Sequence, residues 1–402
     1  MKRTAAILLA ICIIFLIPAA AYATGGDVEQ LTSSVSTEDT PAAAQFSAEG
    51  IDAISAILIE QSTGRVLFEY NADAPLPPAS VTKTMTMLLV FEALDDGRIK
   101  LDDKVSVSQN AASMGGSQVY LEAGEEMDVD TLLKCMIVAS ANDAAVALAE
   151  HIYGSEASFV ARMNERAKEL GCTASNFENV TGLDDTVTSH VMSARDVAVI
   201  SAEIMKHKKV TDYSTVWMDT IRDGAFGLTN TNRLIRFYDG ATGLKTGSTA
   251  KAKFCISATA ERQGLSLVAV VMGSSTRDAR NELAKNMLDF GFANFAAVKK
   301  DAADMGAVTV KGGTAATVGA KRAEFSAVVD KSDASKIEES VEMPEFVTAP
   351  VKAGQVIGKV TFRVGDSVVG TADVLATGDV GKISFWTMLP KLLLWFIMSP
   401  ES

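Results

Sequence analysis

A serine and a lysine three residues apart are the first candidates for chemistry in this sequence. Ser80 and Lys83 lie in a segment that begins with Pro77 and Pro78, and a run of apolar residues follows Lys83. Prolines are tolerated just before a helix but not inside one, so we expect a buried helix to begin near Ser80. Residues three apart share one face of a helix, which would bring the Ser80 hydroxyl close to the Lys83 amine.

This pair could perform nucleophilic catalysis. A serine hydroxyl is a weak nucleophile until a neighbouring base takes its proton. A lysine can be that base only where burial or a nearby cation lowers its pKa. The free backbone N–H groups in the first turn of the helix could bind an oxyanion. Because Ser-x-x-Lys is a common pattern, a surface helix that happens to carry both residues is an open alternative.

A second polar pattern, Ser140-x-Asn142, interrupts a strongly apolar region. The sequence predicts one helix from Asp128 to Val138, and a new helix that begins around Asn142 and ends near Tyr153. Considered alone, a helix stop followed by an Asn or Asp N-cap is the more common meaning of such a pattern.

A third pattern, Lys245-Thr246-Gly247, precedes two predicted strands, Phe254–Ala260 and Leu265–Met272. A glycine in a strand can let a substrate approach the backbone closely. Considered alone, these three residues more commonly belong to an exposed edge strand that carries a lysine.

The remaining elements must position these three patterns. Two apolar runs, Ala53–Glu60 and Arg65–Tyr70, flank a Gln-Ser-Thr-Gly turn and predict a β-hairpin. Residues 294–378 are rich in Val, Thr, Gly and Ala in alternating patterns, which predicts a small all-β domain. Further helices are expected at 80–94, 158–170, from 193 onward and at 277–290.

Composition limits the possible functions of the chain. It has 402 residues, of which 48% are hydrophobic, and a net charge of −13, so we expect a folded protein that does not bind nucleic acid. Three of the four cysteines (Cys135, Cys172 and Cys255) follow the N-terminal segment without a zinc or disulfide pattern, and we expect them in the core. The three histidines show no metal-ligand spacing either, so we expect no metal or other cofactor.

Both ends of the chain suggest a membrane. Residues 1–23 read as a secretory signal peptide with Lys2, Arg3, an apolar stretch and a small-x-small cleavage site, and a polar leader covers residues 24–45. The apolar segment 384–398 would reach only ~22 Å as a helix, short of the ~30 Å hydrocarbon core. Its Trp and Lys residues favour a helix at the membrane interface over one docked on the protein.

The three patterns together are far more specific than any one of them. In this order they resemble the penicillin-recognising serine acyl-transferases. Their flanking residues resemble the low-molecular-mass D-alanyl-D-alanine carboxypeptidases, over roughly residues 50–380. The segments that carry this resemblance are Pro78–Lys83, Ser140–Ala145, Asn179–Leu183 and Gly243–Gly247.

The resemblance implies an α+β fold. A five-stranded antiparallel sheet flanked by helices, with a helical cluster beside it, would form a catalytic domain at residues 46–293. A β domain at 294–378 and an amphipathic anchor at 379–402 would follow. The enzyme would be secreted and held on the outer face of the cytoplasmic membrane by the C-terminal helix, and its partners would be the peptidoglycan stem peptide and β-lactam antibiotics.

The resemblance also implies a reaction, removal of the terminal D-alanine from the stem pentapeptide. Ser80 would attack the carbonyl of the penultimate D-alanine, and Lys83, with its pKa lowered by the cationic Lys245, would act as base. Ser140 and Asn142 would carry protons and hold the peptide amide.

The same resemblance assigns residues to binding. The backbone N–H groups of Ser80 and Ser248 would form an oxyanion hole. The terminal carboxylate would be bound by Lys245, Thr246 and, in the register of the family, Arg280 rather than Arg277. Gly247 completes the third pattern. The sequence departs from the family at Lys251 and Lys253, which would add two cations beside the site.

Two other functions are compatible with parts of this pattern. A class A β-lactamase shares the three motifs, but it lacks a C-terminal β domain and anchor and needs an acid for deacylation that we do not find. A catalytically silent wall-binding protein would not need every motif residue to be intact.

Overall fold

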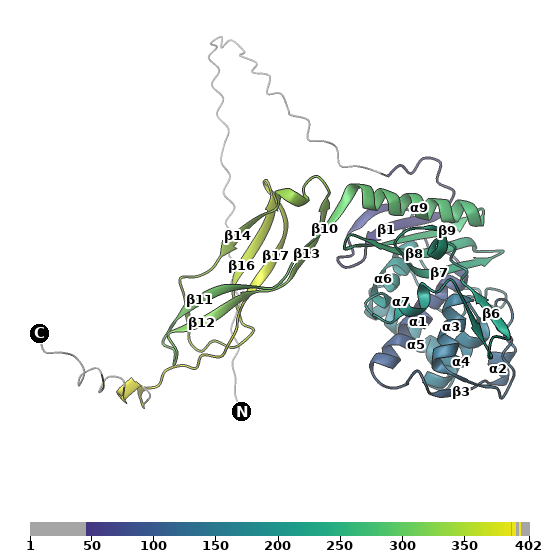
Figure 1. Ribbon diagram of the computed structural model, residues 1–402, viewed down its shortest axis with the longest axis horizontal. Coiled ribbons are helices and arrows are strands. Elements are labelled where there is room, and N and C mark those ends of the chain that lie inside the picture. The colour runs from purple at the N-terminus through teal and green to yellow at the C-terminus, as the bar shows by residue number, and fades with distance from the viewer. Residues whose placement is uncertain (1–45, 387, 391–393, 395–402) are drawn as a thin grey trace, which may run out of the picture. The chain divides into compact units, whose positions relative to one another are not determined.

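The computed structural model describes residues 46–386, 388–390 and 394 (Figure 1). The predicted signal peptide, the leader and most of segment 384–398 lie outside these residues. In the described part of the chain, every helix is too short or too polar to cross a bilayer.

A five-stranded antiparallel sheet forms the centre of the catalytic domain. Its strands lie in the order β2, β1, β9, β8, β7, so that β7 is an edge strand. The predicted hairpin is confirmed as β1 and β2. The bounds are β1 Ser55–Glu60, β2 Val66–Tyr70, β7 Ala241–Thr249, β8 Lys253–Arg262 and β9 Leu265–Ser274.

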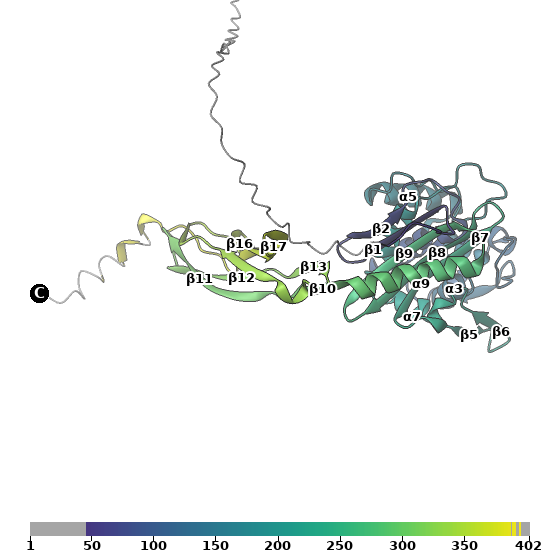
Figure 2. The same ribbon diagram turned by 90° about the horizontal axis from the view of Figure 1, so that it is seen from above.

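Both faces of this sheet are covered, which explains its continuous apolar strands. Ile57 and Ile59 of β1 pack into the core beneath the helical cluster, whereas Ala56 and Leu58 pack on the opposite face. Helix α9 (Arg277–Asn294) covers that opposite face and lies across β8 and β9 (Figure 2). It continues beyond the predicted end at Phe290, and a Cβ on Gly291 would meet Leu267 Cδ1 at 2.5 Å, so this glycine permits close packing on the sheet.

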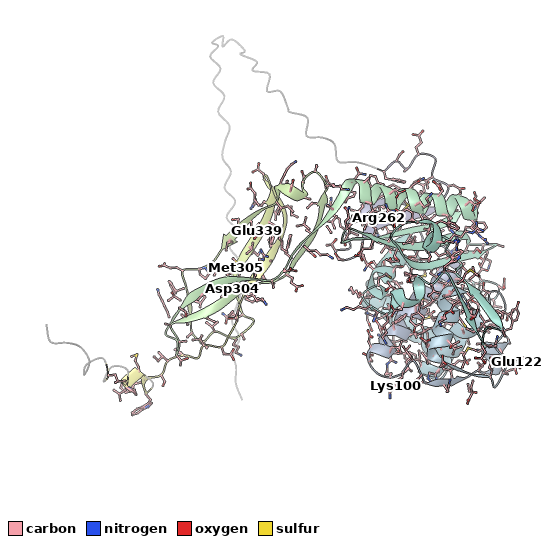
Figure 3. All side chains as sticks on the ribbon, in the orientation of Figure 1. Lys100, Glu122, Arg262, Asp304, Met305 and Glu339 are labelled. Atoms are coloured by element: carbon pink, nitrogen blue, oxygen red, sulfur yellow. The ribbon has the colours of Figure 1, made fainter. Side chains whose placement is uncertain are left out.

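The helical cluster is built around α1 (Lys83–Asp95). Residues from Met85 to Phe91 are all buried, so no side of this part of the helix faces solvent. Apolar residues therefore do not recur every three to four positions, as they would in a helix with one exposed face. Charged side chains such as Lys100 and Glu122 are exposed on the outer surface of the cluster (Figure 3). The other longer helices of the cluster are α3 Val129–Val138, α4 Asn142–Tyr153, α5 Glu156–Glu169 and α6 Ala194–Ile204.

Short elements complete the catalytic domain. Two small two-stranded sheets, β3 with β4 and β5 with β6, are separate from the main sheet. The bounds are β3 Lys104–Ser106, α2 Gln109–Ala112, β4 Glu126–Asp128, α7 Val210–Ser214, β5 Met218–Ile221, β6 Phe226–Thr229 and α8 Leu234–Phe237.

The second domain is all β, as predicted. Six strands form a sheet in the order β14, β16, β17, β12, β11, β15, and β10 pairs with β13. Its own core contains Phe325 and Phe362, whose rings stack at 3.8 Å between centroids. The bounds are β10 Phe295–Lys300, β11 Ala303–Lys311, β12 Thr317–Arg322, β13 Phe325–Asp330, β14 Glu338–Glu342, β15 Phe346–Thr348, β16 Val356–Val364 and β17 Ser367–Ala376.

Candidate active site

Ser80 and Lys83 meet through a tight turn rather than a turn of α-helix. Residues Ala79–Thr82 form a 3-10 helix, and α1 begins at Lys83. The Lys83 Nζ donates to Ser80 Oγ at 3.0 Å, to Asn142 Oδ1 at 2.5 Å and to the Thr181 carbonyl at 3.1 Å. The lysine is 0% exposed, so the surface-helix alternative is wrong.

The surroundings of Lys83 favour its neutral form. Burial lowers the pKa of the Lys83 amine well below its usual value, and the charge of Lys245 lowers it further, while Asp143 opposes both. Both causes that the sequence analysis considers, burial and a nearby cation, therefore act on Lys83, and burial is the larger one. A neutral amine 3.0 Å from Ser80 Oγ has a lone pair that can accept the hydroxyl proton.

Ser140 and Asn142 do not cap a helix, so the capping interpretation is wrong. The N-cap of α4 is Ala141, which makes no side-chain cap bond. Asn142 instead accepts from Lys83 and donates to the Gly115 carbonyl at 2.7 Å. Ser140 has a left-handed backbone with φ of 62°, and its hydroxyl accepts from Lys245 Nζ at 2.8 Å.

Lys245 lies behind the cavity rather than on an exposed strand edge. It is 1% exposed, although β7 is the edge strand, so the exposed-edge interpretation is wrong. Its ammonium donates to Ser140 Oγ and to the Thr246 carbonyl. Burial lowers the pKa of Lys245 to about 7, and Arg280 contributes in the same direction.

The glycine of the third pattern allows two backbones to approach each other. A Cβ on Gly247 would lie 2.9 Å from the backbone nitrogens of both Ser80 and Val81. Strand β7 therefore passes directly against the turn that carries the nucleophile, and the sequence had explained this glycine by substrate approach alone. Gly182 makes a similar approach that the sequence did not reveal: its φ is +82°, and a Cβ there would lie 1.8 Å from the Ala79 carbonyl oxygen.

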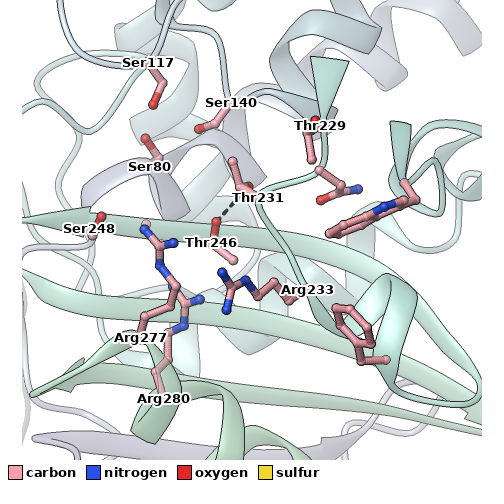
Figure 4. Close-up of a pocket in the computed structure, with 14 residues that line it drawn as sticks. Ser80, Ser117, Ser140, Thr229, Thr231, Arg233, Thr246, Ser248, Arg277 and Arg280 are labelled. Atoms are coloured by element: carbon pink, nitrogen blue, oxygen red, sulfur yellow. Dashed lines mark hydrogen bonds between the residues drawn. The ribbon is translucent and has the colours of Figure 1, made fainter. Parts of the chain in front are cut away.

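A cavity of about 700 Å³ opens beside Ser80 (Figure 4). Ser140, Thr246, Gly247 and Ser248 line it together with Ser80, and Thr246 Oγ1 donates to Thr231 Oγ1 at 2.8 Å. The lining set also includes residues that the sequence did not single out, namely Ser117, Trp217, Thr229, Asn230, Thr231, Arg233 and Phe237.

Both arginines considered from the sequence line this cavity. Arg280 is 2% exposed, and its guanidinium donates to the Cys255 carbonyl and to Asn281 Oδ1. Arg277 is exposed, so the choice of Arg280 over Arg277 does not exclude the latter from the cavity. Lys251 and Lys253 are absent from the lining, and Lys251 donates to the Asp184 carbonyl at 2.9 Å.

His190 holds the Ser80 turn, a role that nothing in the sequence indicated. Its Nδ1 accepts from the Glu178 backbone N–H at 3.0 Å, so its Nε2 carries the proton and donates to Thr82 Oγ1 at 2.7 Å. Burial lowers the pKa of His190 to about 4, against opposing effects of Glu178 and Asp184. The imidazole is therefore neutral in the folded protein at neutral pH.

This histidine should make stability fall on mild acidification. The pKa of His190 is about 4 in the folded protein and 6.5 in an unperturbed side chain. Its contribution to stability is therefore complete above pH 6.5 and is lost as the pH falls toward the folded pKa. Between about pH 7 and about pH 5 the loss should be about 2 kcal/mol. Urea unfolding at both pH values should show this loss in wild type and a clearly smaller one in His190→Gln. His151→Gln, which alters an exposed histidine, should behave as wild type; equal losses in all three proteins would contradict the assignment.

Comparison with known proteins agrees with this geometry. Residues 41–276 match the peptidase S11 family, described as D-alanyl-D-alanine carboxypeptidase, and residues 292–382 match the C-terminal domain of penicillin-binding protein 5. The D-alanyl-D-alanine carboxypeptidase DacF of Bacillus subtilis is 42% identical over 349 residues, which are 85% of this chain and 89% of that protein.

The chain belongs to the D-alanyl-D-alanine carboxypeptidase family.

Solved structures agree with this assignment. Penicillin-binding protein 5 from Haemophilus influenzae matches this carboxypeptidase with a TM-score of 0.74 and 30% identity, over 84% of this chain and 100% of the other. Penicillin-binding protein D2 from Listeria monocytogenes, solved in an ampicillin-bound form, matches with a TM-score of 0.56 and 31% identity, over 61% of this chain and 100% of the other.

These matches confirm three predictions made from the sequence: the family, the α+β fold with its all-β second domain, and the carboxypeptidase function. They do not favour the alternatives of a β-lactamase or a silent wall-binding protein.

Proposed function

We propose that this carboxypeptidase removes the terminal D-alanine of the peptidoglycan stem pentapeptide through an acyl-enzyme on Ser80. Lys83 takes the Ser80 proton, and Ser140 passes a proton to the amine of the departing D-alanine. The backbone N–H groups of Ser80 and Ser248 bind the oxyanion. Water then releases the shortened peptide from the ester.

The contact between Lys83 and Ser80 carries this proposal. A fully buried lysine normally needs an acid as partner, yet the acceptors around Lys83 Nζ are a hydroxyl, an amide oxygen and a carbonyl. Burial without a carboxylate contact, together with the nearby charge of Lys245, favours the neutral amine over the ammonium, and the neutral amine is the form that a general base requires.

The carboxylate end of the substrate is assigned to the cationic side of the cavity. Thr246 and Arg280 line the cavity, and Lys245 lies directly behind it with its ammonium on Ser140. We propose that the three residues hold the terminal carboxylate, while Asn142 holds the peptide amide. A charge-assisted contact of this kind is stronger than a neutral hydrogen bond and fixes which peptide bond faces Ser80.

A direct test is the release of D-alanine from a synthetic stem pentapeptide by the purified protein. We expect one D-alanine per peptide and a tetrapeptide product that is not shortened further. We also expect β-lactams to acylate the same serine, because the ampicillin-bound Listeria protein has the same fold. Release of no D-alanine by a protein that a β-lactam still labels would contradict the proposed substrate.

We further propose that the enzyme is secreted and acts on the outer face of the cytoplasmic membrane. The proposal is supported by the signal-like residues 1–23 and by the apolar C-terminal segment. Among the described residues near that end, Phe385 and Trp386 are exposed by 65% and 77%. Exposed aromatic side chains of this kind suit the boundary between lipid headgroups and acyl chains.

Ending the chain after Gly381 should therefore abolish membrane binding without reducing activity. None of the residues assigned to the site lies beyond Arg280, so hydrolysis of a small peptide should be unchanged. Flotation with liposomes measures the difference between the secreted protein as isolated and the same protein without residues 382–402. If the shortened protein floats as well as the complete one, the membrane contact lies elsewhere, and an uncleaved N-terminal segment would be tested next.

A further inference from the structure

Three arginines line one side of the cavity, more than a single terminal carboxylate requires. Arg277 and Arg280 come from the first turns of α9, and Arg233 directly precedes α8. Figure 4 shows the three guanidinium groups gathered on the side of the cavity below Thr246. They reach this place from two segments more than forty residues apart in sequence, so a single local turn does not explain the cluster.

The negative charge near these arginines is exposed to solvent and lies outside the cavity. Among the described residues, no acidic side chain lines this cavity. The Asp278 carboxylate lies 3.9 Å from Arg233 Nη1, but its side chain is 89% exposed and therefore well screened by water. Within a chain of net charge −13, this is a local concentration of positive charge.

The arginines also act on one another electrostatically. Burial lowers the pKa of Arg280 to about 10; the charges of Arg277 and Arg233 act in the same direction, while Cys255 and Asp278 oppose it. Like charges held close together are unfavourable unless an anion joins them. The terminal carboxylate of the proposed substrate would pair with Arg280. The proposed function assigns no anion to Arg233 or Arg277.

We infer that Arg233 and Arg277 form a second carboxylate subsite on the leaving-group side of the active site, which accepts a terminal D-amino acid with an acidic side chain. This inference rests on the proposed function, because that function places the terminal residue of the peptide beside Thr246 and Arg280. A guanidinium can bind a carboxylate through two parallel hydrogen bonds, which suits a side chain such as that of D-glutamate.

The chemistry on such a substrate is the same acyl transfer. The bond between Ser80 Oγ and the carbonyl carbon forms, the peptide C–N bond breaks, and the hydroxyl proton ends on the amine of the released D-glutamate. Water then hydrolyses the ester and restores Ser80. The two arginines take no part in bond making; they hold the leaving residue and so determine specificity.

This subsite can be tested with three N-acetylated peptides. They end in D-alanyl-D-alanine, D-alanyl-D-glutamate or D-alanyl-D-glutamine. D-Glutamine has nearly the shape of D-glutamate without its charge. We expect kcat/KM for the glutamate peptide to exceed that for the glutamine peptide by about 10-fold at low salt. The ratio should fall as ionic strength rises, because Arg233 and Arg277 are exposed.

Variants of the arginines separate this subsite from a general charge effect. Arg233→Gln and Arg277→Gln should each bring the glutamate-to-glutamine ratio close to one. Arg236→Gln removes the same charge from α8, the helix that Arg233 directly precedes, and serves as a control. Arg236 lies over the Trp217 and Phe237 rings at 5.7 and 5.8 Å and does not line the cavity. It should keep the wild-type ratio. Titration with a labelled penicillin counts the folded active sites in each preparation.

The outcomes distinguish the inference from the function on which it rests. Cleavage of D-alanyl-D-alanine combined with a wild-type glutamate-to-glutamine ratio of one or less would overturn the subsite and leave the proposed function intact. A ratio that the control variant reduces as much as Arg233→Gln does would overturn it as well. If none of the three peptides is cleaved, the proposed function itself fails, and the inference fails with it.

Discussion

Replacing Ser80 with alanine should abolish covalent labelling by penicillin. A β-lactam resembles the terminal D-alanyl-D-alanine, and its ring amide acylates the same nucleophile. Without Ser80 Oγ, Lys83 has no hydroxyl to activate, and the rate of acylation should fall by at least about 10⁴-fold. Mass spectrometry of the intact protein after incubation with penicillin measures the loss of the adduct.

A control must separate lost chemistry from lost folding. Ser106→Ala removes an exposed serine from strand β3 and should label as wild type. Ser80→Ala should retain the wild-type unfolding temperature within a few degrees, because Lys83 Nζ still has Asn142 and Thr181 as acceptors. An adduct of normal yield on folded Ser80→Ala would assign the nucleophile to another residue.

Short sequence patterns were sufficient to predict most helices and strands, because neighbouring residues determine where these elements form. The β1–β2 hairpin follows from two apolar runs around a short turn, and the prolines before Ser80 mark where the turn and helix begin. The extension of α9 beyond Phe290 was missed because it depends on Gly291 packing against Leu267, which is distant in sequence.

The sequence motifs were sufficient to identify the active-site residues, but not to predict which side chains these residues contact. The helix stop before Ser140-x-Asn142 is confirmed, since α3 ends at Val138, but the contacts to Lys83 and Lys245, which are distant in sequence, show a role that is not capping. His190 carried no signal at all, since its role depends on Thr82, 108 positions away. Arg233 was missed for the same reason: only the folded chain brings it near α9.

The second large effect is expected at Lys83. Lys83→Arg keeps the positive charge but cannot give up its proton near neutral pH, so the base is lost while a cation remains. Lys83→Ala removes both. Acylation by penicillin should slow by at least about 10²-fold in each variant. Stopped-flow measurement of the acylation rate tests this, with Lys134→Arg as the control at a half-buried lysine that pairs with Asp219 and does not line the cavity.

The pH dependence identifies the base more sharply than the rate alone. Because the pKa of Lys83 is lowered well below its usual value, the wild-type rate should be high above that lowered pKa and fall as pH decreases through it. Both Lys83 variants should lose this acidic limb of the pH–rate profile.

Near-normal acylation by Lys83→Arg would instead favour Lys245 as the base, since Lys245 contacts Ser140 at 2.8 Å and has a pKa of about 7. In that case Ser140→Ala, which removes the hydroxyl that Lys245 contacts, should abolish the remaining rate. With Lys83 as base, the same variant should keep the acidic limb of the acylation profile.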